Sequence, residues 1–402
     1  MIELTDQREI KFAILSHVLP PSWSGQAMVL YRLLRPLDQG CYCLISRQNY
    51  DSEIYRGDSP FRLKAHYYHL PAEFRIGWLS RFGLFPMESW LQTVQRARRI
   101  SQILKREQSN AVVACSGDLY DLPAAYLASR WRDVRYYAYL FDDYVYQWAA
   151  PLHRAFAQRW ERVVVERAAR IIVPNEFLGK EYEDRYGIKP IVIHNPCEES
   201  ETGQTIERAW PAHLGEIKIV YTGAIYHAHY DAFQNMLTAI REIGRPEMKL
   251  HLYTAQPASD LEQQAITGPV VVHSHLPRRE IAHVQQDADL LFLALAFRSP
   301  IPEVIRTSAP GKTGEYLASG RPILVHAPSD SFLSWYFKKH ECGLVVDRHE
   351  PAELTQAILR IIEDEPLRKH LAKNALVCAK RDFDPQVARA DFLKLFQPTI
   401  KG

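Results

Sequence analysis

Short apolar and β-branched runs alternate along the chain with longer stretches whose apolar residues recur at helical spacing. In the first half the runs predict strands at Phe12–Leu15, Ala111–Cys115, Arg135–Leu140, Arg170–Val173 and Ile191–His194. In the second half they predict strands at Ile217–Thr222, Lys249–Tyr253, Val270–His273, Leu290–Ala294, Ile323–His326 and Gly343–Val346. Helical stretches such as Met28–Leu37 and Leu91–Arg106 separate the strands. This alternation predicts an α/β protein whose parallel sheets are covered by helices on both faces.

The length of 402 residues exceeds what one ordinary hydrophobic core accommodates, so the chain is expected to form two domains. The polar stretch PCEESETGQTIERAWPAHLGE, residues 196–216, has two prolines, two glycines and no clear period, which is typical of a linker. We therefore predict a first domain at 1–200, a linker at 201–215 and a second domain from 216 onward. Two doubly wound domains that face each other would form a cleft, with ligands at the carboxyl ends of the strands.

The composition excludes several classes of protein. Apolar residues make up 47% and charged residues 24% of the chain, and the net charge of +2 gives no reason to expect nucleic acid as a partner. The six cysteines form no CxxC pair, so free thiols are expected rather than disulfides or zinc. The N-terminus does not resemble a signal peptide, and no apolar run approaches the roughly 20 residues that span a bilayer. A cytoplasmic protein is expected.

The stretch SAPGKTGEYLASGRPILV, residues 308–325, predicts a short helix that leads into a strand. Pro310 suits a first helical turn, and Ser308 just before it is a candidate N-cap. Gly320 is the candidate C-terminal stop.

Two charged residues in this stretch suggest a nucleotide site. The exposed amides of a helix start, with Lys312 beside them, favour an anion such as a phosphate. Glu315, one turn further on, would instead accept hydrogen bonds from sugar hydroxyls. The alternative is a solvated i, i+3 pair that contributes a few tenths of a kcal/mol.

Five segments, in order, resemble one family. They are KFAILSHVLPPSWSGQAMVLYRLL, ERAARIIVPNEFLGKEYEDRYGIKPIVIHNPCE, KIVYTGAIYHAHYDAFQNMLTAI, VVVHSHLPRREIAHVQQDADLLFLAL and PGKTGEYLASGRPIL. Together they resemble the retaining nucleotide-sugar glycosyltransferases with two Rossmann-like domains, the GT-B architecture of the group 1, family 4 type. The C-terminal stretch DFDPQVARADFLKLFQ, within residues 382–402, is similar to the family's terminal helix, which crosses back onto the first domain. The second domain is then expected at 216–381.

The resemblance implies a site for the donor diphosphate. Gly25 and Gly223 would let the backbone approach the ligand, the amides around Gly311–Gly314 and Lys312 would hold the phosphates, and Glu315 would bind the ribose. A lone glycine after a strand is more often simply part of a turn. The donor-binding residues implied are Gly25, Gly223, His227, Leu276, Arg306, Ser308, Lys312, Thr313, Gly314 and Glu315, and the catalytic candidates are Asp118, Asp142 and Lys312.

The sequence departs from the family pattern at two places. Where many relatives carry a first glutamate, eight positions before Glu315, this chain has Thr307, so Glu303 or Ser308 would have to address the transferred sugar. Ala224 stands where relatives often have an arginine, which leaves four cations for the diphosphate: His227, His229, Arg306 and Lys312. A histidine beside a diphosphate would be protonated, so activity is expected to fall as the pH rises.

The resemblance also implies chemistry without a metal or other cofactor. The histidine pairs His227/His229 and His273/His275 lack an accompanying Asp-x-Asp, which favours a loop or core role over metal binding. The matched motifs offer no clear second carboxylate, which a covalent double displacement would need. The family implies front-face transfer, in which a donor phosphate oxygen takes the acceptor's proton.

The acceptor would be a glycan or a lipid-linked sugar, bound by the first domain. Asp118, Asp142 and Asp143 follow predicted strands and are candidates for orienting its hydroxyl, although helix capping explains them equally well. The aromatic run EFRIGWLSRFGLFPMESW, residues 73–90, is compatible with a peripheral membrane contact, but such runs more often pack as a lid or a core helix.

Two other functions stay open. A non-hydrolysing nucleotide-sugar 2-epimerase has the same two-domain fold and would release an epimerised donor without any acceptor. A lapsed, non-catalytic protein would bind nucleotide weakly or not at all, and the retained Lys312 and Glu315 argue against it.

Overall fold

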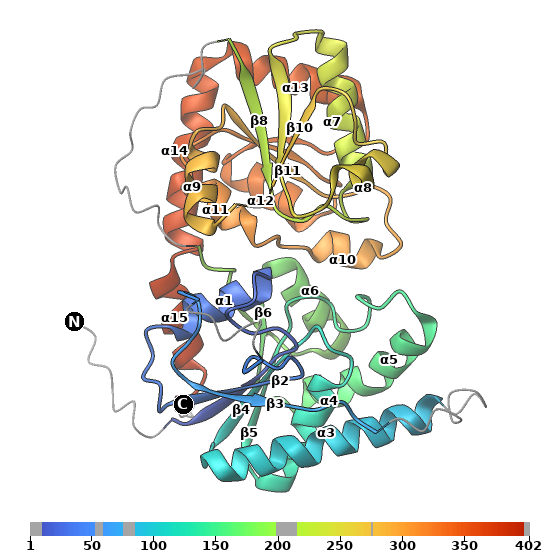
Figure 1. Cartoon of the computed structure of the whole chain (residues 1–402), viewed down its shortest axis with the longest axis vertical. Helices are drawn as coiled ribbons and strands as arrows, with labels where there is room; N and C mark the ends of the chain where they lie inside the picture. Colours follow the sequence, from blue (N-terminus) through green and yellow to red (C-terminus); the bar gives the residue numbers. More distant parts are fainter. Residues whose placement is uncertain (1–9, 53–58, 75–84, 198–214, 275, 398–402) are drawn as a thin grey trace. The chain divides into compact units, whose positions relative to one another are not determined.

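The computed structural model describes residues 10–52, 59–74, 85–197, 215–274 and 276–397. The chain forms two compact units (Figure 1). The first consists of Met1–His194 together with Pro385–Gly402, and the second of Asn195–Asp384.

The first unit contains a seven-stranded parallel sheet in the order β3-β2-β1-β4-β5-β6-β7. Its strands are β1 (Phe12–Leu15), β2 (Tyr42–Ser46), β3 (His66–His69), β4 (Ala111–Cys115), β5 (Arg135–Tyr139), β6 (Arg170–Val173) and β7 (Ile191–Val192). Its helices are α1 (Gly25–Leu34), α3 (Phe85–Glu107), α4 (Asp121–Arg132), α5 (Pro151–Glu166), α6 (Glu176–Tyr186) and α15 (Pro385–Lys394).

The second unit contains a six-stranded parallel sheet in the order β10-β9-β8-β11-β12-β13. Its strands are β8 (Ile217–Thr222), β9 (Met248–Tyr253), β10 (Val270–His273), β11 (Leu290–Ala294), β12 (Ile323–His326) and β13 (Leu344–Val346). Its helices are α7 (Tyr230–Ile243), α8 (Ala258–Gln263), α9 (Arg278–Gln286), α10 (Pro302–Thr307), α11 (Lys312–Ala318), α12 (Phe332–His340), α13 (Pro351–Glu363) and α14 (Glu365–Asp382).

The predicted parallel α/β class is confirmed, and the predicted strands agree closely with those observed. Seven of them have the observed bounds, and the other four differ by one or two residues at an end. Two strands were missed, β2 and β3. Strand β2 is fully buried, whereas β3 reads HYYH and is half-exposed at the edge of the sheet, so it lacks the apolar run that marks a buried strand.

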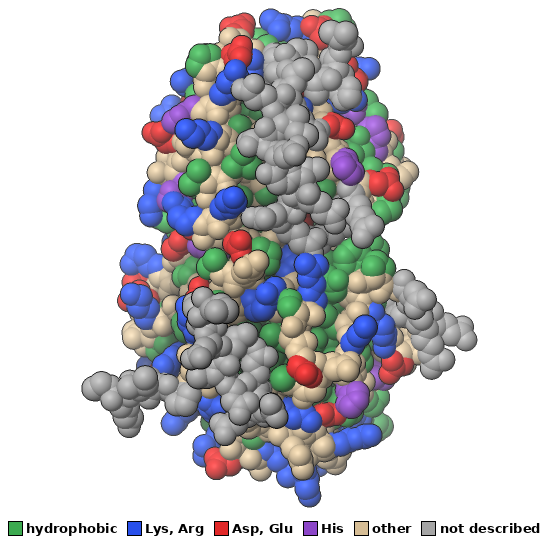
Figure 2. All heavy atoms as spheres, turned by 90° about the vertical axis from the view of Figure 1, so that its left-hand side faces the viewer, with side chains coloured by type: hydrophobic (Ala, Val, Ile, Leu, Met, Phe, Trp, Pro, Cys, Tyr) green, Lys and Arg blue, Asp and Glu red, His purple; other side chains and the backbone are tan. Residues whose placement is uncertain are grey.

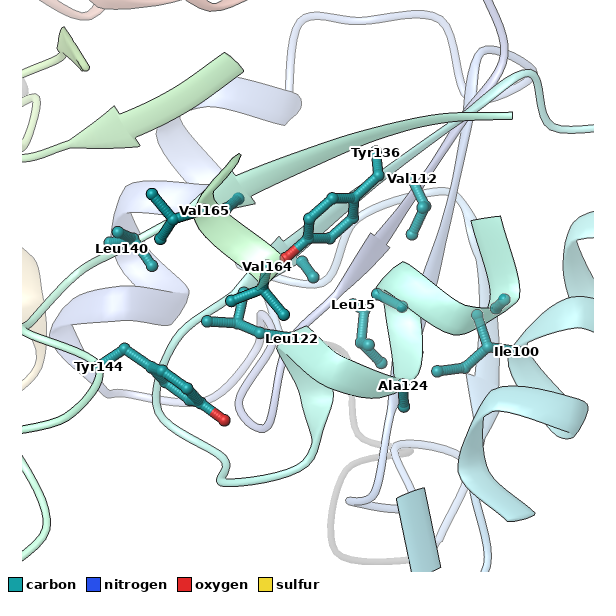
Figure 3. Packing of buried hydrophobic residues seen from close by; sticks show 14 of the residues in the cluster. Leu15, Ile100, Val112, Leu122, Ala124, Tyr136, Leu140, Tyr144, Val164 and Val165 are labelled. Atoms are coloured by element: carbon teal, nitrogen blue, oxygen red, sulfur yellow. The ribbon is translucent and has the colours of Figure 1, made fainter. Parts of the chain in front are cut away.

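Each sheet is buried between layers of helices. In the first unit one apolar cluster, which includes Tyr136 and Val164, lies between the sheet and the helices α3, α4 and α5 (Figure 3). A second cluster on the opposite face is completed by the C-terminal segment. The rings of Phe392 and Phe396 lie 6.0 and 4.8 Å from that of Phe12, between ring centroids. Burying one such side chain contributes about 1.5–3 kcal/mol, so α15 is held firmly against β1 and α1.

The strand order reverses direction once in each sheet, between β1 and β4 in the first unit and between β8 and β11 in the second. At such a point the connections leave to opposite faces, and the loops at the carboxyl ends diverge to leave space for a ligand. The loops that follow β1, β4, β8 and β11 are therefore the places where a site is expected.

Within the described residues, no helix is long and apolar enough to cross a membrane. Basic and acidic side chains are interspersed on the face of each unit that Figure 2 shows, without one continuous basic patch. Among the cysteines, Cys43, Cys115, Cys342 and Cys378 are buried free thiols.

Candidate functional site

The stretch 308–320 in the second unit folds differently from the prediction at its start. Helix α11 begins at Lys312, and its N-cap is Gly311, which makes no side-chain capping bond. The predicted N-cap, Ser308, is wrong because Ser308 instead ends the preceding helix α10 with an extended backbone. At the other end Gly320 has a φ of 73°, as a chain-reversing glycine after a helix requires.

The Lys312 ammonium lies at the carboxyl end of β8. It donates a hydrogen bond to the Tyr221 hydroxyl and sits 3.7 Å from the centroid of that ring. Gly223, the first residue after β8, has a φ of 114°, and a Cβ there would be 3.2 Å from Lys312 Nζ. Glycine at this position therefore provides both the backbone conformation and the space for the ammonium.

The surroundings of Lys312 disfavour its charge. Burial lowers the pKa of Lys312 to about 7, and the nearby Glu315 carboxylate only partly opposes this shift. Near neutral pH such a lysine carries its positive charge only part of the time, because nearby negative charge does not fully balance the cost of burying it. An anionic ligand at this point would raise its pKa again, which is the behaviour expected of a phosphate-binding lysine.

Glu315 lies in a polar group with strand β8 and helix α9. Its Oε2 atom is 3.5 Å from Gln285 Nε2, which also donates to Thr222 Oγ1 at 3.1 Å. The Tyr316 hydroxyl accepts from the Thr222 amide at 2.9 Å and fixes α11 against the strand. Sequence reasoning missed Tyr221 and Gln285, because nothing in the local pattern of β8 or α9 distinguishes them from ordinary core or surface residues.

One of the two histidines after β8, His229, lies where burial disfavours a positive charge. His229 is buried, and burial holds its pKa well below the usual range, with the positive charges of Lys312 and His227 adding to the effect. His229 is therefore neutral near pH 7 in this structure, which does not support it as a replacement for the missing arginine. His227 is exposed on the same loop.

The remaining donor-side candidates lie on neighbouring elements. Arg306 and Ser308 are half-buried at the end of α10, Leu276 is half-buried just before α9, and Thr313 is buried in α11. Glu303, in the first turn of α10, has an Oε2 atom without a hydrogen-bond partner within the described part of the chain. The structure thus brings together Gly223, Lys312 and Glu315.

The acceptor-side candidates of the first unit occupy different settings. Asp143 is buried and accepts hydrogen bonds from the amides of Val145 and Tyr146, at 3.0 and 3.1 Å, besides an ion pair with Arg185. It therefore has a local structural role rather than the predicted acceptor role. Asp142 beside it is exposed.

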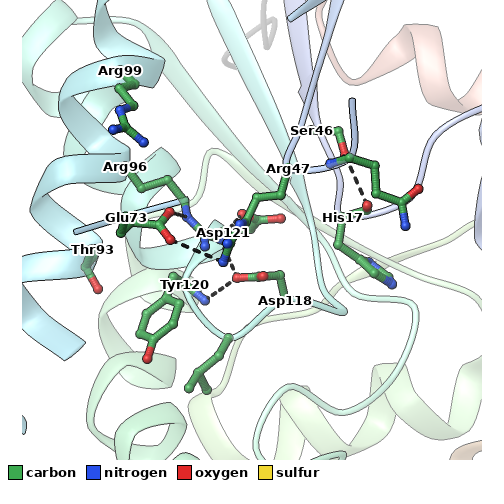
Figure 4. Close-up of polar contacts among 12 residues, drawn as sticks. His17, Ser46, Arg47, Glu73, Thr93, Arg96, Arg99, Asp118, Tyr120 and Asp121 are labelled. Atoms are coloured by element: carbon green, nitrogen blue, oxygen red, sulfur yellow. Dashed lines mark hydrogen bonds and ion pairs between the residues drawn. The ribbon is translucent and has the colours of Figure 1, made fainter. Parts of the chain in front are cut away.

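Asp118 belongs to a charged group at the carboxyl ends of β2, β3 and β4 (Figure 4). Its Oδ1 atom pairs with Arg96 and accepts from the Tyr120 amide at 2.8 Å. Sequence reasoning missed Arg96, because the position on α3 reads as one more basic residue of an amphipathic helix.

Two family models match the chain in succession. Residues 24–201 match the model described as Glycosyltransferase Family 4, and residues 216–364 match the one described as Glycosyl transferases group 1. The chain belongs to the group 1 glycosyltransferases. A comparison with curated protein sequences gives no match.

Solved structures show the fold of this glycosyltransferase to be GT-B. Sucrose-phosphate synthase from Thermosynechococcus elongatus has a TM-score of 0.68 at 14% identity, covering 96% of this chain and 98% of its own. Anabaena HepE in complex with UDP-glucose has a TM-score of 0.65 at 14% identity, with 96% and 98% covered. A putative UDP-N-acetylglucosamine 2-epimerase from Listeria monocytogenes has a TM-score of 0.60 at 14% identity, with 96% and 95% covered, so the fold does not separate transferases from epimerases.

Helix α11 of the glycosyltransferase contains a glycine required by packing. A Cβ at Gly314 would be 2.9 Å from Phe383 Cδ1 and 3.0 Å from Cys197 Cβ. At Gly25, the first residue of α1, a Cβ would meet no atom within 4 Å, and φ is not positive. The fold therefore explains glycine at position 314 but not at position 25.

Gly314→Ala is accordingly expected to destabilise the protein, whereas Gly25→Ala is expected to leave its stability unchanged or slightly raised. Overpacking of a close contact costs about 1–3 kcal/mol, which corresponds to a fall of several degrees in Tm. Differential scanning calorimetry of the two variants checks this. Equal melting temperatures would show that Phe383 and Cys197 move aside at no cost.

Some candidates of the glycosyltransferase lie outside the described residues. These are His275, linker residues 201–214 and the centre of the aromatic run (75–84). At the ends of that run Glu73 is buried, whereas Met87 and Trp90 are exposed. Within the described ranges no group of three or more His, Cys, Asp or Glu side chains suits a metal ion.

Proposed function

We propose that this group 1 glycosyltransferase moves a hexose from a nucleoside-diphosphate donor to a hydroxyl of a glycan, a polysaccharide precursor or a lipid-linked sugar. The observation that carries the proposal is the placement of Lys312 Nζ beside Gly223 at the carboxyl end of β8, with Glu315 one helical turn away. An ammonium and open backbone suit a diphosphate, and a carboxylate suits ribose hydroxyls. The UDP-glucose in the Anabaena HepE structure supports a nucleotide sugar as the donor.

The proposed reaction retains the anomeric configuration and needs no metal. As the bond between the sugar and the diphosphate breaks, negative charge grows on the leaving phosphate, and the Lys312 ammonium stabilises it. The acceptor hydroxyl attacks from the same face and gives its proton to that phosphate oxygen. Asp118 and Asp142 would orient the acceptor.

Gly25 supports ligand binding in the first unit. Since neither packing nor φ requires glycine there, its missing side chain is best explained by the close approach of a ligand to the start of α1. Ser24 caps this helix by accepting from the Ala27 amide at 3.2 Å, so the turn is well defined.

The donor site is tested by thermal unfolding of the wild type and Glu315→Ala with UDP-, GDP-, ADP- and CDP-sugars. A donor at one hundred times its Kd stabilises the fold by about 2.7 kcal/mol, and we expect one nucleotide to raise Tm by several degrees in the wild type only. Glu365→Ala, which removes an exposed glutamate of α14 in the same unit, serves as the matched control and should keep the full shift.

The outcomes distinguish the candidate functions. Stabilisation of both variants by the same nucleotide would place the ribose away from Glu315. No stabilisation by any nucleotide would favour the non-catalytic alternative. Once the donor is known, analysis of the products separates transfer from epimerisation, because an epimerase converts the donor itself in the absence of any acceptor.

A further inference from the structure

Five charged side chains meet at one end of the first sheet. Arg47 follows β2, Glu73 follows β3, and Asp118 and Asp121 follow β4 at the start of α4, while Arg96 enters from α3. Figure 4 shows the two arginines pointing toward the three carboxylates between them. We refer to these five residues as the Arg96 cluster.

Arg96 is the centre of the cluster. Its side chain is completely buried, and its Nε donates to Glu73 Oε1 at 2.7 Å. Its Nη1 is shared between Asp118 Oδ1 and Asp121 Oδ1. Arg47 reaches the other oxygen of Glu73, at 3.2 Å. A planar guanidinium that holds carboxylates from several segments fixes their positions far more strictly than a lysine would.

The carboxylates of the cluster outnumber its guanidiniums. The cluster contains three carboxylates and two guanidiniums, and two of its buried polar atoms, Arg96 Nη2 and Asp121 Oδ2, have no hydrogen-bond partner in the described structure. Burial together with the Asp118 charge raises the pKa of Asp121. Buried, unpaired polar atoms are rare in native proteins and call for a ligand or another explanation.

Asp118 is the carboxylate of the cluster that a ligand can reach. Its side chain is 19% exposed, whereas those of Glu73 and Asp121 are 3% and 1% exposed. Its Oδ1 atom is occupied by Arg96 and the Tyr120 amide, and no described group bonds its Oδ2 atom.

His17, which follows β1, borders the same place. A Cβ at Gly117 would be 2.5 Å from the His17 ring, so the glycine allows the ring to lie against the chain beside Asp118. Asp118 and His17 thus flank the β1/β4 switch point, where the parallel sheet is expected to hold a ligand.

We propose that Asp118 Oδ2 accepts a hydrogen bond from an uncharged sugar hydroxyl of the acceptor, and that Arg96 is the positioning residue that aims this carboxylate. The proposal deepens, and rests on, the proposed glycosyl transfer. It specifies the acceptor class, because an ionised phosphate or carboxylate has no hydrogen to donate to Asp118 Oδ2 and would place a second negative charge against this carboxylate. Any anionic group of the acceptor must then bind elsewhere.

The test uses the full-length protein with the nucleotide sugar found by thermal unfolding. Transfer is measured to methyl glucoside, glucosamine, glucuronic acid and glucose 6-phosphate. The variants are Asp118→Asn, Arg96→Lys and the double variant. Arg185→Lys is the matched control, since Arg185 also pairs with two buried carboxylates of the first unit, Asp143 and Glu161.

We expect transfer to methyl glucoside to exceed transfer to either anionic probe. Asp118→Asn should lower kcat/KM for methyl glucoside about 10- to 100-fold, as expected for one hydrogen bond to a charged group, with the donor Kd unchanged. Arg96→Lys should lower it as well, but should add nothing in the Asp118→Asn background, because both changes remove the same interaction. Arg185→Lys should lower Tm without changing kcat/KM.

The proposal is overturned by a preference for an anionic probe that Asp118→Asn leaves unchanged, by full activity of Asp118→Asn, or by additive effects of the two substitutions. Transfer to none of the four probes by a protein that binds its donor would also count against it. Preferential transfer to glucosamine would show that Asp118 binds an amine of the acceptor, and this would contradict the proposed hydroxyl. Failure to bind any nucleotide sugar is a different result and would contradict the proposed function itself.

Discussion

Lys312→Met is expected to reduce kcat by about 10²- to 10³-fold, the effect of removing one preorganised group that stabilises charge in the transition state. Lys312 is the cation beside Gly223, and the loop that follows offers a neutral histidine, His229, in place of a basic pair. Steady-state kinetics with the identified donor measure the effect. The matched control is Lys339→Met, which removes another lysine above an aromatic ring of the second unit, that of Trp335, and should leave kcat unchanged.

The same substitution should make the protein more stable at neutral pH. The pKa of Lys312 is lowered from 10.5 to about 7 in the folded state. Between these two values the unfolded chain binds more protons, so wild-type stability rises with pH there, and the penalty is fully present below pH 7. Lys312→Met should therefore raise Tm at pH 6 and do so much less at pH 10.5. A fall in Tm at pH 6 would show that the Tyr221 contacts outweigh the burial of charge.

The pH dependence of catalysis should follow the same lysine. The profile of kcat/KM reports the free enzyme, so it should decline above about pH 7 as Lys312 loses its proton. The kcat profile should decline at higher pH, because the bound diphosphate raises the pKa of Lys312. Lys312→Arg, whose charge does not titrate, should flatten the kcat/KM profile, and an unchanged profile would assign the pH dependence to another group.

Arg96→Met is expected to destabilise the first unit by about 3–5 kcal/mol, because removal of one partner leaves buried carboxylates without their counter-charge. Calorimetry or urea unfolding measures the loss. Arg162→Met is the control, since its i, i+4 pair with Glu166 on α5 is exposed and its loss should not be measurable. A change below about 1 kcal/mol would mean that the cluster tolerates the loss of this guanidinium at little cost.

The strands were predictable because burial on both faces imposes a continuous apolar run. Leu290–Ala294 is such a run, and it forms β11 with those bounds, completely buried. His66–His69 lacks it, since an edge strand has a neighbour on one side only, and its place in the sheet depends on pairing with Tyr42–Ser46. Interactions between strands are not visible in the spacing of residues along one of them.

The candidate site was predictable only in part. The sequence indicated Lys312, Glu315 and Gly223 through the ordered motifs of a known family, and the structure brings these three together. The cap of the helix was misplaced at Ser308, because helix α10 uses the residues before it. The histidine charge was also misjudged. Whether His229 is buried depends on how its loop packs, and burial decides its protonation.

The sequence by itself determined the parallel α/β class, most strand positions and the family, because periodicity and short motifs are local properties that can be recognised without knowledge of the fold. Only the tertiary structure placed Lys312 against Tyr221, a residue 91 positions away, and gathered Arg47, Glu73 and Arg96 around Asp118. The physical reason is that a parallel sheet collects the carboxyl ends of strands that are distant in the chain. Which side chains meet there, and which lose their charge, then depends on strand order and close packing.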